Sequence, residues 1–397
     1  MLYNNINLLG GIIMEEESIL DDKNKIVMKL LHYFITEKNY NPIILQGVEN
    51  EIWLENLSED YKVVRIVSGH IHNDEQYDFD KFKTKRILKK IKKKTLSLNM
   101  NVFSFFLNIS DNVTENLTEN NNSLGVKIND EKDLKKNETI KKVFPDLSKK
   151  TEFTEDGMEL FAKITSDINI HNQKDADRME NLFREKLPLI TNVIICLNVL
   201  IYLFGALTGN LDKMISMFCV DAAAIRKGEI YRLFTAMFIH ENIFHLLINC
   251  YIIYSVGSQL ESFLGKIKYL IIYLFGGLVA ALFSMSFLKT GYTSLGTDGV
   301  MFAIMGSLIY FGYHYRVYLG NVIRNQIIPF VILSILLSIL LGGIDIYAYI
   351  GGLLGGLVIT IALGVKDKTT TFEKVNGWIV SLLFLAFLTY IAFIYTA

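Results

Sequence analysis

The second half of the chain consists of long apolar stretches separated by short polar connections. Each stretch is close to the roughly 20 residues that an α-helix needs to cross the ~30 Å hydrocarbon core of a bilayer. The pattern therefore predicts an all-α polytopic membrane protein over this half. The seven predicted spans are residues 189–208, 239–261, 267–288, 296–314, 325–343, 346–365 and 378–396.

The first half has the pattern of a small α/β domain. Apolar residues over Ile26–Phe34 recur at helical spacing, and the short apolar runs that follow are typical of strands. The opening segment, Met1–Ile13, lacks a basic start and a small-residue cleavage site, so it does not predict a secretory signal. We therefore expect residues 1–110 to form a cytosolic domain. Its predicted strands are Pro42–Leu45, Glu51–Leu54, Tyr61–Val67 and Val102–Leu107.

A basic stretch, Lys81–Lys94, lies inside this domain and has apolar residues between its lysines. One interpretation is a surface for anionic lipid headgroups beside the membrane. The other is a solvated helix face, which is the more usual position of such a run. The sequence leaves both interpretations open.

The next part of the chain, residues 108–150, is rich in Asn, Glu, Asp and Lys and holds few aromatic residues. Such a composition buries too little apolar surface to offset the entropy of ordering the chain. Phe153–Lys186 then has the pattern of a charged helix that leads to the membrane. We predict a disordered linker and a charged connector over residues 111–187.

Composition and cysteine content limit the partners and the sites that the sequence predicts. The 397 residues are 51% apolar, and their formal net charge of -1 hides a charged first half and a nearly uncharged second half. That balance gives no argument for nucleic acid or for acidic partners. Cys196, Cys219 and Cys250 lie far apart, without the spacing of a disulfide framework or a zinc site.

Lysine and arginine beside the predicted spans set the expected orientation, because positive residues resist translocation. Most of them fall on one side of the membrane if the N terminus is cytoplasmic. Arg226, Lys227 and Arg232 fall in the first outer loop and break the pattern, which a loop lying in the interface would explain. The residues that fit the pattern are Arg184, Lys186, Lys266, Lys268, Arg316, Arg324, Lys366, Lys368 and Lys374.

Polar residues within bilayer spans are costly, so they are candidates for function. His240, His245 and Asn249 lie on the second span, and a spacing of four puts His245 and Asn249 on one helix face. Gly296-Thr297-Asp298-Gly299 opens the fourth span, and Ala348-Tyr349-Ile350-Gly351-Gly352 opens the sixth. Two polar residues alone would favour a role in helix packing. The match of all three blocks, in this order, to a known family favours a functional site instead.

These blocks, within Leu189–Leu363, resemble the rhomboid family of intramembrane serine proteases. The resemblance implies a six-helix core over residues 188–366 and an extra transmembrane helix over residues 367–397. It also implies that His245 and Asn249 stand where the family donates hydrogen bonds to the oxyanion. The other residues that match the family's structural pattern are Tyr231, Arg232, His240, Gly257, Glu261, Gly296, Gly299, Gly306, Gly352 and Gly356.

The two positions that carry the family's chemistry differ in this chain. Asp298 stands at the position of the nucleophilic serine, and Tyr349 at that of the general-base histidine. A neutral tyrosine, with a reference pKa of about 10, is a poor base near neutral pH. The resemblance with these departures implies a rhomboid pseudoprotease that binds transmembrane segments of client proteins and needs no cofactor. We expect Asp298, Tyr349 and His245 to form a structural polar cluster.

Other chemistries stay open. Family membership by itself would imply an active intramembrane serine endopeptidase. An aspartyl protease would use Asp298 with Asp345, and these would have to lie close enough to share a proton. The His70-Ile71-His72 turn and its acidic neighbours have side chains that suit a divalent metal, but a polar turn is the more usual interpretation, and we expect no metal site.

The N-terminal domain, with its Asn50–Leu54 strand, resembles the cytosolic extension of some Firmicute-type rhomboids. The predicted location is therefore a bacterial plasma membrane, with the N terminus in the cytoplasm. Expected partners are transmembrane client proteins and the lipid bilayer, together with a cytosolic partner for the N-terminal domain, and no nucleic acid.

Overall fold

The computed structural model describes residues 22–45, 48, 50–118, 122–287, 293–341 and 345–395. Its chain divides into two compact units, Met1–Asn181 and Leu182–Ala397. The segment Met1–Ile13 lies outside the described residues, as do residues 288, 342, 343 and 396 at the ends of predicted spans. The prediction of a helical membrane region joined to a small α/β domain is confirmed.

The first unit is built on a five-stranded sheet with the strand order β1-β2-β3-β4-β5. The first three strands are antiparallel to one another, whereas β3, β4 and β5 are parallel. Helix α4 (Asp74–Lys94) joins β3 to β4 and makes the crossover that a parallel pair requires. The strands are β1 (Asn41–Ile43), β2 (Glu51–Glu55), β3 (Val63–Val67), β4 (Val102–Phe106) and β5 (Ser123–Lys127).

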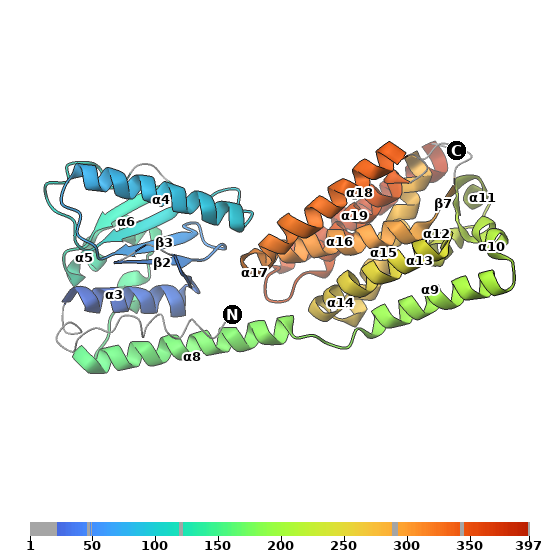
Figure 1. The fold of residues 1–397 in the computed structure, drawn as a ribbon. Coiled ribbons are helices and arrows are strands. Elements are labelled where there is room, and N and C mark those ends of the chain that lie inside the picture. The colour runs from blue at the N-terminus through green and yellow to red at the C-terminus, as the bar shows by residue number, and fades with distance from the viewer. Residues whose placement is uncertain are drawn as a thin grey trace. The chain divides into compact units, whose positions relative to one another are not determined.

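Helices cover both faces of this sheet (Figure 1). On one face, α3 (Asp22–His32) and α8 (Gly157–Phe183) pack against strand residues such as Leu54 and Phe105. On the other face, α4 packs against strand residues such as Trp53. Because side chains alternate along a strand, neighbours such as Trp53 and Leu54 belong to different cores.

The segment predicted as a disordered linker and connector, residues 111–187, instead carries a strand and several helices. It contributes β5 to the sheet, and α8 agrees with the predicted charged helix. Each short helix buries one apolar residue in the same core as α3. One residue is enough to hold each helix, because α3, α8 and the strands already form that core. Composition alone therefore misled the prediction. The short helices, with these residues, are α5 (Glu131–Lys136; Leu134), α6 (Glu138–Val143; Ile140) and α7 (Leu147–Lys150; Leu147).

A charged residue, Arg65, lies in the middle of the sheet on the α4 side and is 1% exposed. Its guanidinium donates to the two carboxylate oxygens of Asp80 at 2.8 and 2.6 Å and to Glu51 at 3.0 Å. Burial acts to lower the pKa of Arg65, but the bonds and charges of Asp80 and Glu51 outweigh burial and raise it. The buried charge is thus compensated within the unit.

We predict that Asp80→Ala lowers the free energy of unfolding of the first unit by about 3–5 kcal/mol, because it leaves the Arg65 charge buried without its closest partner. Denaturant unfolding of the full chain measures the loss through Trp53 fluorescence, in a Trp378→Phe background. Lys135→Ala is the matched control, since it removes only an exposed ion pair with Glu152 and should leave the midpoint unchanged. A loss below about 1 kcal/mol for Asp80→Ala would contradict the structural role of the network.

The second unit is helical, and its helices α15, α16 and α19 pack against one another (Figure 1). α13 (Ile243–Ile252) continues through a π-helical turn into α14 (Ser258–Leu264), and α17 (Arg316–Val322) continues in the same way into α18. The longer helices are α9 (Leu189–Leu207), α15 (Lys266–Phe287), α16 (Gly296–His314), α18 (Ile328–Leu341), α19 (Ile346–Leu363) and α20 (Thr371–Tyr390). The loop after α9 holds α10 (Leu211–Phe218), α11 (Ala222–Arg226) and α12 (Arg232–Thr235).

Six helices in the described part of the chain are long and apolar enough to cross a membrane, and the chain is a multi-pass integral membrane protein. Six of the seven predicted spans correspond to them. The fourth prediction, residues 296–314, forms the 19-residue helix α16 but is not among the six. Most of α16 is buried between other helices, so it carries glycine and polar residues where a lipid-facing helix would be apolar. The six helices are Leu189–Leu207, Ile243–Leu264, Lys266–Phe287, Arg316–Leu336, Ile346–Leu363 and Thr371–Tyr395.

Glycines bring α16 and α19 into backbone contact. A Cβ atom on Gly352 would lie 1.9 Å from the carbonyl oxygen of Gly299, and one on Gly356 would lie 1.9 Å from that of Ala303. A Cβ atom on Gly306 would lie 2.1 Å from the carbonyl oxygen of Leu353. The two helices can approach this closely only because these Cβ atoms are missing. This packing fixes the first turn of α19 beside the first turn of α16.

Candidate functional site

The first turns of α13 place two polar side chains on one face. The Asn242 side chain accepts a hydrogen bond from the backbone N–H of His245 at 2.9 Å and so caps the helix. His245 and Asn249 follow four residues apart, which puts one above the other. Asn249 is 1% exposed, and 19% of the His245 side chain is exposed.

The start of α16 is tied to the segment that precedes α13. The Thr297 side chain is buried, and its hydroxyl donates to the carbonyl oxygen of Ile239 at 2.8 Å. Asp298 is the next residue, about 100° further around the helix. Its side chain is partly buried and lies beside α13.

The first turn of α19 supplies Tyr349. Asp345 caps this helix by accepting from the backbone N–H groups of Tyr347 and Ala348 at 3.0 and 3.1 Å. The Tyr349 ring stacks on Phe302 of α16, with ring centroids 4.2 Å apart and planes 14° apart. The stacking keeps the tyrosine hydroxyl within reach of Asp298.

The Asp298 carboxylate joins three helices. Its Oδ1 atom lies 2.8 Å from Nε2 of His245 and accepts from Nδ2 of Asn249 at 3.2 Å. Its Oδ2 atom accepts from the Tyr349 hydroxyl at 3.3 Å. We call His245, Asn249, Asp298 and Tyr349 the Asp298 cluster. The structure thus brings together four of the residues that the sequence analysis singled out as candidates for the site.

His240 lies beside this cluster rather than within it. It is 2% exposed, and its ring centroid lies 5.4 Å from that of His245. It follows Ile239, whose carbonyl accepts from Thr297. His240 therefore packs at the junction between α13 and α16.

Tyr231 and Arg232 hold the loop that precedes α13. Arg232 is 6% exposed and donates to Glu229 at 2.7 Å and to the carbonyl oxygen of Ser216 at 2.7 Å. Tyr231 donates to Glu229 at 2.9 Å. The bonds from Arg232 and then Tyr231 hold the pKa of Glu229 below its usual range. Arg232, which breaks the predicted charge pattern, is therefore buried with a carboxylate partner.

Glu261 has a partner that sequence reasoning missed. Its carboxylate accepts from the backbone N–H groups of Ile190 and Thr191 at 2.9 and 2.8 Å and from the Thr191 hydroxyl at 2.8 Å. These residues begin α9, so Glu261 satisfies the unpaired N–H groups of that helix from another helix. Gly257 makes room nearby, since a Cβ atom there would lie 2.4 Å from the Tyr269 hydroxyl.

The two aspartates of the aspartyl-protease alternative have different partners. Asp298 bonds to the other three members of the cluster, whereas Asp345 caps α19 and accepts from the Ser284 hydroxyl. Within the described ranges no hydrogen bond or ion pair joins the two carboxylates. The two carboxylates thus take part in separate sets of hydrogen bonds.

In the first unit, the turn with His70 and His72 is followed by Asp74, whose carboxylate has structural partners. The rings of His70 and His72 lie 3.8 Å apart. The carboxylate of Asp74, however, accepts from the hydroxyl and N–H of Thr114 and from the N–H of Glu115. These bonds, the Thr114 hydroxyl first, lower the pKa of Asp74. In the residues that the structure describes, no group of three potential ligands is placed to hold a metal ion.

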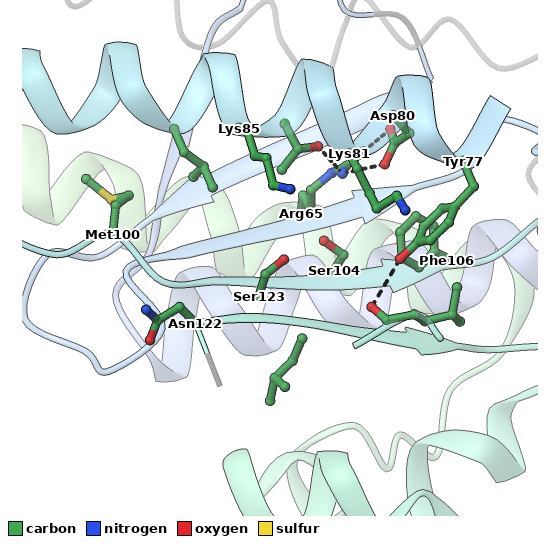
Figure 2. Close-up of a pocket in the computed structure, with 14 residues that line it drawn as sticks. Arg65, Tyr77, Asp80, Lys81, Lys85, Met100, Ser104, Phe106, Asn122 and Ser123 are labelled. Atoms are coloured by element: carbon green, nitrogen blue, oxygen red, sulfur yellow. Dashed lines mark hydrogen bonds and ion pairs between the residues drawn. The ribbon is translucent and has the colours of Figure 1, made fainter. Parts of the chain in front are cut away.

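A hollow of about 150 Å³ lies between α4 and the strands β4 and β5. Figure 2 shows Lys81 and Lys85 reaching from α4 toward it, with Ser104 on the strand below. It forms because the side chains paired across the sheet shrink from Arg65 to Ser104 to Gly125. Its charges are largely matched inside the unit, since Lys81 pairs with two carboxylates. The candidate functional site is therefore the Asp298 cluster.

Comparison with known proteins finds similarity over the part of the chain that holds the Asp298 cluster. The Rhomboid domain family matches residues 227–366. Rhomboid protease GluP of Bacillus subtilis (strain 168) is 30% identical over 196 residues, which are 49% of this chain and 38% of GluP. RHOMBOID-like protein 1 of Arabidopsis thaliana is 25% identical, over 38% of this chain and 39% of that protein. Rhomboid protease AarA of Providencia stuartii is 27% identical, over 44% and 72%. The chain thus spans well under half of the first two relatives.

We predict that Asp298→Ala lowers the thermal stability of the second unit, because three side chains lose their acceptor. At about 0.6 kcal/mol for each hydrogen bond between membrane helices, the expected loss is roughly 2 kcal/mol. Thermal unfolding of the purified chain in detergent measures it. Asp298→Asn should lose less, since the amide oxygen still accepts from α13. The same melting temperature for wild type and Asp298→Ala would mean that the cluster does not stabilise the unit.

Proposed function

Because its domain at residues 227–366 makes this chain a member of the rhomboid family, we propose that it is a catalytically inactive rhomboid that binds transmembrane segments of client membrane proteins. The observation that carries the proposal is the bond between Tyr349 and Asp298, at 3.3 Å. The positions that match the family's base and nucleophile face each other, and neither residue type can do that chemistry.

Serine-type hydrolysis needs a hydroxyl that a neighbouring base can deprotonate. Asp298 offers a carboxylate that is already occupied by three donors. The neighbouring hydroxyl, that of Thr297, is buried and donates to Ile239. His245 and Asn249 bond the carboxylate, so the groups that match the oxyanion donors are engaged in the resting protein. The site supports a structural linkage rather than turnover.

Binding of client helices is supported by the apolar surface of the second unit. On α13, the side chains of Phe244, Leu247 and Tyr251 are 74%, 57% and 72% exposed. Most described side chains of α18 are exposed or partly exposed. Such surfaces contact lipid in a membrane, where another apolar helix can replace the lipid through close packing. We infer that client segments bind laterally against these helices.

We infer further that the protein lies in a bacterial plasma membrane with its N terminus in the cytoplasm. The lysines and arginines between successive spans support this orientation. The first unit would then be a cytosolic platform that is available to a cytosolic partner.

An active intramembrane serine endopeptidase is the second candidate. It is favoured by the names of GluP and AarA, which are called rhomboid proteases. This candidate requires a nucleophile other than Asp298 in the same cluster. The two candidates therefore differ in whether a serine-directed reagent reacts with the chain.

We predict that a fluorophosphonate probe does not label the purified chain, and that a model transmembrane substrate stays intact. The double variant Asp298→Ser/Tyr349→His should gain labelling, because it places a serine and an imidazole at positions already in contact. Each single variant lacks one partner and should stay unlabelled. Gel fluorescence after incubation in detergent measures all four proteins.

Labelling of the wild-type chain, abolished by Asp298→Ala, would overturn the inactive assignment. A double variant that folds but stays unlabelled would mean that residues 298 and 349 do not occupy the geometry of the catalytic pair. Its melting temperature is the check on folding.

We predict that a photoreactive residue at Leu247 of α13 crosslinks to a single-span reporter helix co-reconstituted in vesicles. The matched control is Val380 on α20, which is 50% exposed. This helix contributes no residue to the Asp298 cluster. Lateral binding beside α13 predicts stronger crosslinking at position 247 than at position 380, without cleavage of the reporter. Equal yields would indicate random collision and would contradict client binding at this face.

A further inference from the structure

We propose that the outer face of α4, in the first unit, binds the headgroups of anionic lipids. The site is a surface patch of basic residues and two exposed phenylalanines along one side of the helix. We call it the α4 basic face, and its residues are Phe79, Phe82, Arg86, Lys89, Lys90 and Lys93. The proposal is independent of whether the rhomboid domain is active.

The geometry of α4 separates this face from the one that packs on the sheet. Tyr77, Asp80, Thr84 and Ile91 are buried against the strands. At about 100° per residue, all six residues of the α4 basic face fall within an arc of roughly 100° on the outer side. Every one of them is exposed. The sheet therefore holds the helix so that this strip of side chains faces away from the strands. Figure 1 shows α4 lying along one face of the sheet.

The two phenylalanines distinguish this strip from an ordinary solvated helix face. Phe79 and Phe82 are 68% and 64% exposed, next to each other on the first half of the strip. A helix face that only meets water gains nothing from two exposed aromatic rings. Aromatic rings combined with lysine and arginine are instead the pattern of helices that lie in the headgroup region of a bilayer.

Three charges of the strip differ from the neighbouring lysines of α4 in their partners. Lys81 and Lys83, which lean toward the sheet, pair with carboxylates: Lys81 with Asp78 and Glu115, and Lys83 with Glu51. Arg86, Lys89 and Lys90 pair with no carboxylate in the part of the chain that the structure describes. The helix dipole favours cations only in the last turn, so it does not account for Arg86. Among the described residues, these three charges have no complementary carboxylate, and a negatively charged partner would supply it.

The occupant is identified by what the chain itself is attached to. The second unit is a membrane protein, so the first unit is always tethered at a bilayer surface. Tethering raises the effective concentration of lipid and adds to the attraction of the patch itself, which four basic residues and two aromatic rings provide. Each Lys or Arg near an anionic surface strengthens binding by about fivefold, and the attraction falls away within a Debye length. An anionic leaflet therefore fits the patch in charge, shape and availability.

The test uses the full chain in zwitterionic nanodiscs, mixed with separate vesicles of phosphatidylcholine alone or with added phosphatidylglycerol. Flotation should recover the protein with the anionic vesicles only, and high salt should release it. Arg86→Glu/Lys89→Glu/Lys90→Glu should weaken recovery by roughly 100-fold or more. The matched control is Lys132→Glu/Lys136→Glu/Lys149→Glu, which places the same charge change on exposed residues of α5 and α7 and should float like the wild type.

A second variant, Phe79→Ser/Phe82→Ser, keeps the charges and should reduce recovery while preserving its sensitivity to salt. Unchanged flotation of the triple α4 variant, or equal recovery with both kinds of vesicle, would overturn the proposal. Absence of flotation by the wild type would overturn it as well and would direct the search to an acidic protein surface. All substituted positions are exposed, and melting temperatures in detergent verify that each variant is folded.

Discussion

A single carboxylate, that of Asp298, determines how the membrane unit is organised around its polar centre. It accepts from His245 and Asn249 on α13 and from Tyr349 on α19, while its own backbone belongs to α16. Its side chain is only 22% exposed, and the three donors reach it from the two neighbouring helices. Asp298 is thereby a link between three helices.

The glycines of α16 and α19 make this link possible. Because the two backbones meet at Gly299 and Gly352, the first turns of the helices cannot slide past each other without a steric clash. Tyr349 then stacks on Phe302 and reaches Asp298 with its hydroxyl. The glycine packing fixes the distance between α16 and α19, and at that distance the Tyr349 hydroxyl can donate to Asp298. The arrangement explains how the Asp298 cluster is held together by helix packing.

Much of the membrane fold and of the Asp298 cluster could be predicted from the sequence. The spacing of His245 and Asn249 on one helix face, and the blocks around Asp298 and Tyr349, led to the hypothesis of a polar cluster that the structure then places together. Hydrophobic length identified six of the membrane helices, because crossing a bilayer fixes both length and composition. α16 showed the limit of that argument, since a helix buried among others is free to be less apolar.

Other features depend on contacts between residues far apart in the chain. Glu261 bonds to the start of α9, some 70 residues earlier, and nothing local in the sequence indicates that pairing. The folding of residues 123–150 onto the first unit depends on a core that other segments supply. The same is true of Arg65, whose charge is acceptable only because Asp80 and Glu51 come to it from different elements.

The most direct measurement is a double-mutant cycle between Asp298 and Tyr349, with Asp298→Ala, Tyr349→Phe and the combined variant unfolded in detergent. If Asp298 and Tyr349 form a bond between α16 and α19, the two losses should be non-additive, with a coupling free energy of about 0.6–1.7 kcal/mol. Purely additive losses would contradict the account, because they would mean that the two side chains contribute separately and that no bond between them links the helices.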